Sequence, residues 1–560
     1  MLKIVVFSFI IFTHCLSIFS QVKHEIRASW ITTIGGLDWP QVKANSPYSI
    51  KSQKEELCRQ LDMLKNANFN TVLFQTRLRG DVIYPSIFET YAESLTGHTG
   101  KNPGYDVLKF AIEECHKRGM ELHAWIVCVP IGNKRQVNLL GKNSVVKKNP
   151  EICKYFNGNW YLDPGNPGSA RYLSNMVKEI VTNYDIDGIH LDYIRYPENG
   201  KDFPDNATFK KYGKGQDLSQ WRRDNITNIV RKIYSDVKLL KPWVKVSSSP
   251  IGKYSDTSRY SSNGWNAYYA VYQDVQLWLK NGIQDIIFPM MYFKDNQFYP
   301  FVLDWQENKH GRWVVPGLGI YFLEERKMEW SQNEILRQIY FTRKHGLDGQ
   351  AYFRNRFLTD NKSRLMENIH ERFYKYPSVI PPMKWQDSIA PVSVSKGEYI
   401  FSPEYIILKW DTEGIKKAGG IYYRIYASSS YPVDTERAEN IVCTRTDGNM
   451  FVCTEGNPYF NKLYWTVCTV DRYGNESTPF EFNKPEKDDV QLLVNRMPDI
   501  PAGGHIIIED GTGRELFKLS ENDKLPQMKK GLYIIHAVYP DGSMQHFSVI
   551  IKRGFMNVSF

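Results

Sequence analysis

The stretch from Asp187 to Pro197, DGIHLDYIRYP, combines residue types that could do chemistry at the end of a short apolar run. Successive side chains of a strand point to opposite faces, so His190 and Asp192 share one face of this run. Burying an unpartnered carboxylate is costly, so Asp192 has either a hydrogen-bonded structural role or a site at the mouth of a strand. Arg195 follows closely and is able to keep the carboxylate ionised.

The surrounding sequence, from about residue 25 to 376, alternates short apolar runs with amphipathic helical segments, which is the pattern of parallel β/α units. The eight runs are Ile26–Thr33, Asn70–Thr76, Met120–Val127, Asp187–Tyr193, Val244–Ser249, Asp285–Tyr292, Val314–Tyr321 and Gly349–Arg354. They predict a TIM-like (β/α)8 barrel with enlarged loops after strands two, three and four, and such barrels keep their chemistry at the strands' C-terminal ends. The boxes Ser52–Glu55 and Ser331–Glu334 predict two helix starts.

Strand alternation also predicts, without an alignment, which side chains point inward at the C-terminal ends of the barrel strands. The expected substrate-binding residues are Arg77, His123, Trp125, Asp163, His190, Tyr193, Arg195, Tyr292 and Tyr352. Aromatic rings stack on the apolar faces of sugars, and the chain holds 14 Trp and 35 Tyr. A structural reading stays open for His123, as a hydrogen-bonded core histidine, and for Asp163, whose Asp-Pro-Gly context is also simple turn chemistry.

Ten motifs, in order along the predicted barrel, resemble the glycosyl-hydrolase-like family 10 proteins. They are Arg27–Trp30, Leu37–Pro40, Asn70–Arg77, Tyr84–Ser86, Leu95–Gly97, Pro103–Asp106, Arg118–Trp125, Leu162–Gly165, Asp187–Pro197 and Trp221–Arg223. The resemblance implies a TIM-like barrel that acts on glycans of the bacterial envelope, and some members resemble hydrolases of peptidoglycan glycan strands. Many members carry an acidic residue where this chain has Arg79. If that acid donates a proton, this chain uses Asp81 instead or has lost activity.

Two functions follow from these residues. The first is a glycoside hydrolase, in which Asp192 is the ionised nucleophile or base and Asp81 or Glu324 is the acid. We expect Arg79 to lower the pKa of Asp81, and the charged neighbours of Glu324 are typical of a solvated loop. The second is a catalytically silent glycan-binding barrel. A metal-dependent deacetylase is disfavoured because His123 and His190 lie on different strands without a clear third ligand, so neither metal nor cofactor is expected.

The first 20 residues predict a secretory signal peptide, because Lys3 precedes an apolar run that is too short to span a membrane. No later stretch is apolar enough to span one, so we expect an exported protein that is periplasmic, cell-surface or secreted. The net charge of +10 is spread along the chain, which argues against nucleic acid and is compatible with cell-wall or cell-surface association. Seven cysteines beyond Cys15 show no metal-ligand spacing.

The composition changes after Tyr376, where Pro377, Pro381 and Pro382 predict a stiff linker between the barrel of residues 21–376 and later β domains. Period-two runs predict a β-sandwich over residues 377–485, and Thr469–Ser477 resembles fibronectin type III domains, which implies a spacer or binding module. Cys443 and Cys453 flank a predicted hairpin and could pair in an oxidising compartment. Asp-Gly turns predict a small all-β domain over residues 486–560, either a sorting domain or a structural cap.

Overall fold

The computed structural model describes residues 21–324, 330–360, 363–402, 404–482, 492–494, 497–510, 514–524, 526, 528–529, 531–541 and 544–551. The predicted signal peptide therefore lies outside the described residues. The chain divides into two compact units, Met1–Ser388 and Ile389–Phe560, and each is described by itself. None of the described helices is both long and apolar enough to cross a membrane.

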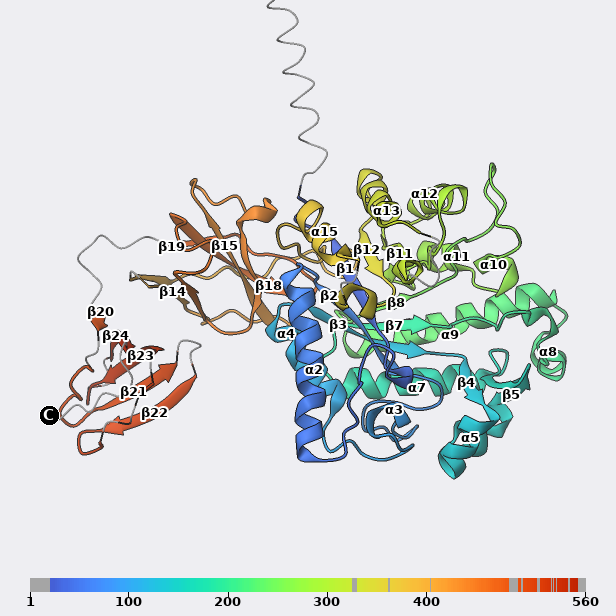
Figure 1. Ribbon diagram of the computed structural model, residues 1–560, viewed down its shortest axis with the longest axis horizontal. Helices are drawn as coiled ribbons and strands as arrows, with labels where there is room; N and C mark the ends of the chain where they lie inside the picture. Colours follow the sequence, from blue (N-terminus) through green and yellow to red (C-terminus); the bar gives the residue numbers. More distant parts are fainter. Residues whose placement is uncertain are drawn as a thin grey trace, which may run out of the picture. The chain divides into compact units, whose positions relative to one another are not determined.

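The first unit is built on parallel strands that follow one another around a barrel (Figure 1). The strands are β1 (Ile26–Ile31), β2 (Thr71–Arg77), β3 (Glu121–Val127), β7 (Gly188–Asp192), β8 (Lys245–Ser248), β9 (Ile286–Ile287), β10 (Trp313–Val314), β11 (Gly317–Leu318) and β12 (Gly349–Tyr352). β10 pairs with β9 and β11 pairs with β12, and only two residues separate β10 from β11. Together they act as one interrupted strand that links β9 to β12, which completes the predicted TIM-like (β/α)8 order.

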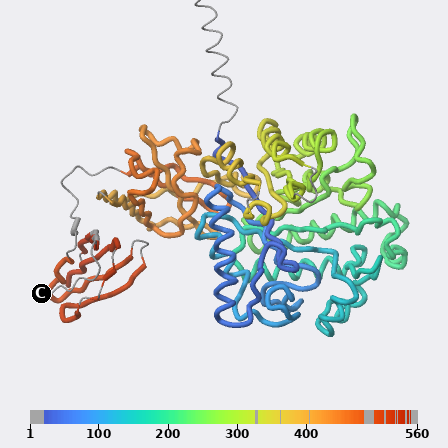
Figure 2. Tube along the Cα trace, in the orientation of Figure 1, coloured from blue at the N-terminus to red at the C-terminus, as the bar shows by residue number. Residues whose placement is uncertain are grey.

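Helices alternate with these strands, as the sequence predicts, and Figure 2 traces the alternation from blue to yellow. They are α2 (Pro47–Asn66), α4 (Val107–Lys117), α7 (Pro167–Asn183), α9 (Leu218–Leu240), α11 (Val275–Lys280), α12 (Tyr299–Glu307), α13 (Gln332–Lys344) and α15 (Leu365–Arg372). Leu57, Leu61 and Leu64 of α2 are buried and lie on one helical face, so this helix is held by its apolar stripe.

One of the two predicted helix starts is confirmed, although neither predicted capping box forms its hydrogen bonds. α2 begins before Ser52–Glu55, because Ser46 is its N-cap, Ser49 completes the capping box, and Pro47 has a φ angle suited to the first helical position. α13 does begin after Ser331, but that side chain makes no capping hydrogen bond. The Ser-x-x-Glu pattern therefore predicted the start of α13 correctly and that of α2 wrongly.

The loops after β2, β3 and β7 are enlarged, as predicted, and they contain most of the remaining short elements. The short helices are α3 (Glu93–Thr96), α5 (Lys134–Leu140), α6 (Val145–Lys148), α8 (Asn206–Tyr212), α10 (Ala267–Ala270) and α14 (Arg356–Thr359). The 3-10 turns are η2 (Ile34–Gly36), η3 (Gly141–Asn143), η4 (Pro150–Ile152), η5 (Gly200–Asp202), η6 (Asp295–Gln297) and η7 (Ile320–Leu323). The loop after β3 folds into an unpredicted antiparallel sheet of β4 (Pro130–Asn133), β6 (Asn159–Leu162) and β5 (Cys153–Phe156).

The proline-rich segment after Tyr376 packs on the first unit and does not form a free linker. The Glu25 N–H donates to the Val379 carbonyl at 3.1 Å, and Trp385 Nε1 donates to Asp285 Oδ1 at 2.9 Å. Met383 is fully buried. The division between the units accordingly falls after Ser388.

The second unit begins with two antiparallel sheets. One contains β13 (Gly397–Phe401), β14 (Tyr405–Trp410) and β17 (Met450–Thr454), and the other β16 (Ile441–Thr446), β15 (Ile421–Ser428), β18 (Tyr464–Asp471) and β19 (Phe480–Phe482), with the 3-10 turn η8 (Ala438–Asn440) before β16. Leu408, Tyr423 and Trp465 share one core, so the sheets pack as a sandwich. Cys443 of β16 and Cys453 of β17 lie in different sheets and are not joined by a disulfide, so the pairing that the sequence left open is not formed here.

The last described strands form a five-stranded sheet with a separate small core. Its order is β20 (Leu492–Val494), β24 (Met544–Ile551), β23 (Gly531–Val538), β21 (His505–Asp510) and β22 (Glu515–Ser520). This part of the chain is therefore all-β in its described residues, as the Asp-Gly turns indicate.

Candidate active site

Asp192 is the last residue of β7 and is only 6 % exposed. Its Oδ1 accepts hydrogen bonds from Ser249 Oγ at 2.8 Å and from the Tyr193 N–H at 2.8 Å, while Oδ2 accepts one from Trp125 Nε1 at 3.0 Å. Burial raises the pKa of Asp192, and these hydrogen bonds with the charge of Arg195 oppose that rise. Three donors from three strand ends therefore fix the carboxylate in one orientation.

The carboxylate lies in the lining of a cavity of about 310 Å³ at the C-terminal ends of the barrel strands. Its aromatic lining residues are Trp30, Trp125, Tyr193, Tyr292 and Phe353, and its polar ones include Thr32, Gln75, Arg79, Ser249 and Arg354. The rings of Tyr292 and Phe353 are stacked with centroids 5.6 Å apart. A cavity of this size with rings and a few fixed polar groups suits a sugar residue.

The loop after β1 is tied to the cavity by two of these polar residues. Arg354 Nη1 donates to Asp38 Oδ1 at 2.8 Å and to the Leu37 carbonyl at 2.7 Å. Gln75 Oε1 accepts from the backbone N–H groups of Thr33 and Ile34, each at 2.9 Å. The Leu37–Pro40 motif therefore positions the rim of the cavity.

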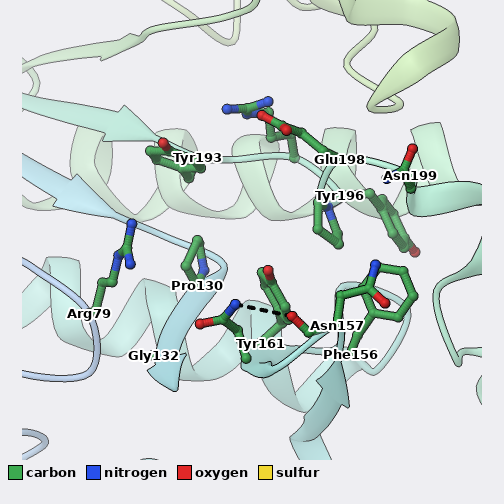
Figure 3. A pocket seen from close by; sticks show the side chains of 13 residues that line it. Arg79, Pro130, Gly132, Phe156, Asn157, Tyr161, Tyr193, Tyr196, Glu198 and Asn199 are labelled. Carbon is green, nitrogen blue, oxygen red and sulfur yellow. Dashed lines mark hydrogen bonds between the residues drawn. The ribbon is translucent and has the colours of Figure 1, made fainter. Parts of the chain in front are cut away.

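A second cavity of about 300 Å³ adjoins the first, because Arg79 and Tyr193 line both. Figure 3 shows Arg79, Tyr161 and Tyr193 around this hollow, from the loop after β2, from β6 and from the loop after β7. Arg195 and Glu198 also line it. The unpredicted sheet of β4, β6 and β5 thus forms part of the site's wall.

Both predicted histidines lie in the barrel interior and outside the lining of either cavity. His123 is 1 % exposed, contacts Glu121 Oε2 through Nε2 at 3.1 Å, and packs so closely on Gly188 that a Cβ there would meet the ring at 2.6 Å. His190 accepts from Trp30 Nε1 at 3.2 Å and contacts Ser247 Oγ at 3.0 Å. Burial keeps the pKa of His190 well below its ordinary range, so it is a neutral core residue.

Arg77, Tyr352 and Asp163 are also structural in this arrangement. A β-bulge after Gln75 breaks the alternation of β2, and Arg77 turns into a buried ion pair with Glu89 at 2.7 Å. Tyr352 pairs in register with Ser29, points away from the cavity and bonds Tyr374 through its hydroxyl at 2.8 Å. Asp163 Oδ2 accepts from Thr208 Oγ1 at 2.6 Å and its Oδ1 from the Gly165 N–H at 3.1 Å, which supports the turn interpretation.

The expected proton donors, Asp81 and Glu324, line neither cavity. Asp81 Oδ1 accepts from the Arg79 N–H at 3.0 Å, and burial raises its pKa to about 7. The expected lowering by Arg79 is therefore wrong, because burial outweighs the hydrogen bond from that N–H. Glu324 is exposed and follows η7.

Several lining residues were not predicted as site residues, although some carried a signal. Ser249 ends the predicted run Val244–Ser249, so alternation with neighbouring strand ends could have found it. Arg79 was noted only as a departure from a motif. Trp30 was noted only within the Arg27–Trp30 motif, and Phe353 only within the run Gly349–Arg354. Glu198 lies in the loop after β7, where no strand or helix periodicity predicts the direction of a side chain.

A TIM-like barrel with a hydrogen-bonded carboxylate and aromatic walls at its strand ends is the arrangement of a glycosidase-like protein. The family model described as glycosyl hydrolase-like 10 matches residues 25–322, and the chain belongs to this family. It is 30% identical to the glycosyl hydrolase YngK of Bacillus subtilis over 483 residues, 82% of this chain and 93% of that protein. It is 31% identical to the glycosyl hydrolase DigH of Escherichia coli K12 over 292 residues, 49% of this chain and 66% of that protein.

Among solved structures, the glycoside hydrolase domain of PgaB (BpsB) from Bordetella bronchiseptica aligns with 62% of this chain and 98% of its own, at 14% identity and a TM-score of 0.41.

Proposed function

We propose that this protein is an exported glycoside hydrolase that cleaves a bacterial envelope or extracellular glycan, such as peptidoglycan glycan strands, with Asp192 as the nucleophile or base. The observation that carries the proposal is the position of Asp192, held by three donors in an aromatic cavity at the strand ends. The apolar leader of residues 1–20 supports export.

The proposed chemistry follows from that position. A sugar stacked on the exposed ring of Tyr193 and on Tyr292 presents its anomeric carbon to the cavity, and an ionised Asp192 stabilises or attacks the positive charge that develops there. The hydrogen bonds from Ser249 and Trp125 favour the ionised form and oppose burial, which raises the pKa of Asp192.

A second carboxyl group completes a glycosidase pair, and two residues of this chain are candidates. Asp81 has a pKa of about 7 and holds a proton near neutrality, but it does not line the cavity. Glu198 lines the adjoining cavity. Among the described residues, Asp192 is the only carboxylate in the lining of the first cavity. Because a glycosidase pair needs a second carboxyl group, this favours the alternative of a glycan-binding barrel without catalysis.

The test is to incubate purified protein with glycans of several classes, including peptide-free peptidoglycan strands, and to measure new reducing ends. Asp192→Asn keeps the size of the side chain and removes its charge, so we expect turnover to fall by about a thousandfold or more in a folded protein. Unchanged turnover would make Asp192 structural. Tight binding by wild type without any new reducing ends would establish the silent, glycan-binding function.

A further inference from the structure

The hollow beside the Asp192 cavity carries a net positive charge. Two guanidinium groups, Arg79 and Arg195, and one carboxylate, Glu198, line it, which leaves a net charge of +1. Because Arg79 and Tyr193 also line the Asp192 cavity, a chain of sugars could place one residue against Asp192 and the next in this hollow.

Arg195 is the stronger indication of a ligand. It is 5 % exposed, and among the described residues its buried Nε and Nη1 have no hydrogen-bond partner. Leaving buried donors unsatisfied is unfavourable, so a ligand that supplies acceptors is favoured. The guanidinium lies 4.6 Å from the centre of the Tyr193 ring, and this stacking holds its plane in place.

Arg79 adds a second positive group on the side nearer Asp192. Its side chain is half-buried, and no ion pair or side-chain hydrogen bond holds its guanidinium within the part of the chain that the structure describes. Its backbone N–H donates to Asp81 Oδ1 at 3.0 Å, which holds the main chain in place. The guanidinium group can therefore bind a ligand without movement of the main chain. Tyr161 and Asn159 supply further polar groups from β6.

We propose that this hollow is a subsite for a sugar that carries a carboxylate, adjacent to the sugar at Asp192. The inference rests on the proposed function and names its substrate class as an acidic glycan. A planar carboxylate matches the paired N–H groups of a guanidinium, and a single negative charge matches a net charge of +1. The carboxylate could belong to the lactyl ether of peptide-free peptidoglycan strands or to a uronic acid, and the test separates these sources.

Binding is measured by calorimetry with the Asp192→Asn protein, so that no probe is consumed. The probes are a peptide-free peptidoglycan tetrasaccharide, the same tetrasaccharide with its carboxyls converted to amides, a uronate tetrasaccharide and a neutral chitin tetrasaccharide. We expect at least one acidic probe to bind about tenfold or more tightly than its neutral counterpart, with a preference that weakens as salt rises. The acidic probe that binds better identifies the source of the carboxylate.

The added Arg79→Gln substitution should remove most of that preference, measured as the ratio of the affinities for the acidic and the neutral probes. Arg195→Gln should do the same, and its urea unfolding midpoint reports whether the buried site still folds. Arg231→Gln is the matched control, since it removes an exposed positive charge from α9.

Equal affinity for acidic and neutral probes, or an undiminished preference in Arg79→Gln, would overturn the subsite. The proposed function would survive that result if wild type still generates reducing ends from a neutral glycan. Failure of every glycan both to bind and to be cleaved would overturn the two proposals together.

Discussion

The carboxyl groups of buried Asp192 and partly buried Asp81 differ in the number of hydrogen-bond donors around them. Burial raises the pKa of Asp192, and three hydrogen bonds and the charge of Arg195 oppose that rise without cancelling it. Asp81 accepts one hydrogen bond from the Arg79 N–H, and burial prevails to raise its pKa to about 7. The sequence predicted a lowered pKa for Asp81, because it shows the neighbouring Arg79 but does not show how far the carboxyl group is buried.

The raised pKa of Asp81 predicts a pH dependence of stability. The folded protein holds this proton up to about pH 7, whereas the unfolded chain releases it near pH ~4. The folded state therefore binds more protons in that window, and its stability falls as pH rises through it. Asp81→Asn should remove this contribution, so urea unfolding at about pH 5 and pH 8 should show a smaller loss of stability than in wild type.

Turnover of the same variant separates a structural from a catalytic role for Asp81. If Asp81 is the proton donor, Asp81→Asn abolishes activity and Glu198→Gln does not; the opposite result assigns the donor to Glu198. An Asp81→Asn protein whose stability follows pH as wild type does would show that the carboxyl is not protonated in the folded state.

At the scale of elements, the β-bulge in β2 determines that Arg77 points into a buried network while Arg79, in the following loop, reaches the cavities. Arg77 donates through Nε and Nη2 to the two oxygens of Glu89 at 2.8 and 2.7 Å, and Nη1 donates to the Cys128 carbonyl at 3.0 Å. Tyr172 of α7 adds a hydrogen bond to Glu89 at 2.9 Å. This network joins β2, its loop, β3 and α7, and it supports the chain from which Arg79 reaches the cavities.

Removing one partner of this network should destabilise the protein strongly. Glu89→Gln leaves the fully buried Arg77 without a counter-charge, so we expect a loss of about 3–5 kcal/mol in the free energy of unfolding, measured in urea. Asp360→Asn is the control, because it breaks the exposed Arg356–Asp360 pair and should cost about 0–1 kcal/mol. Equal effects of the two substitutions would contradict a supporting role for the buried pair.

At the scale of the whole molecule, the two units have separate cores, which supports independent folding of the first. A chain that ends at Ser388 should therefore keep the unfolding midpoint and the turnover of the full protein on soluble oligosaccharides. A chain that ends at Tyr376 is the matched comparison and should be less stable, since it lacks Val379, Met383 and Trp385. Loss of turnover in the longer fragment would show that the β domains contribute to catalysis.

We propose that the sandwich is a spacer or binding module, as the resemblance of Thr469–Ser477 to fibronectin type III domains implies, and that the final sheet is either a sorting domain or a structural cap. Comparing binding of the full chain and the Ser388 fragment to insoluble cell-wall glycan distinguishes a binding module from a spacer.

The sequence by itself determined the eight strand runs, their order and the inward position of Asp192 and Trp125, because apolar periodicity and alternation are local properties of regular strands. Only the tertiary structure decided that Arg77 leaves the mouth, that Tyr352 faces away from it, and that Arg79 and Tyr161 enter the site's walls. A bulge shifts alternation by one residue, and the inward face of a short strand depends on its register with neighbours. Both depend on contacts between segments distant in sequence, so local patterns do not encode them.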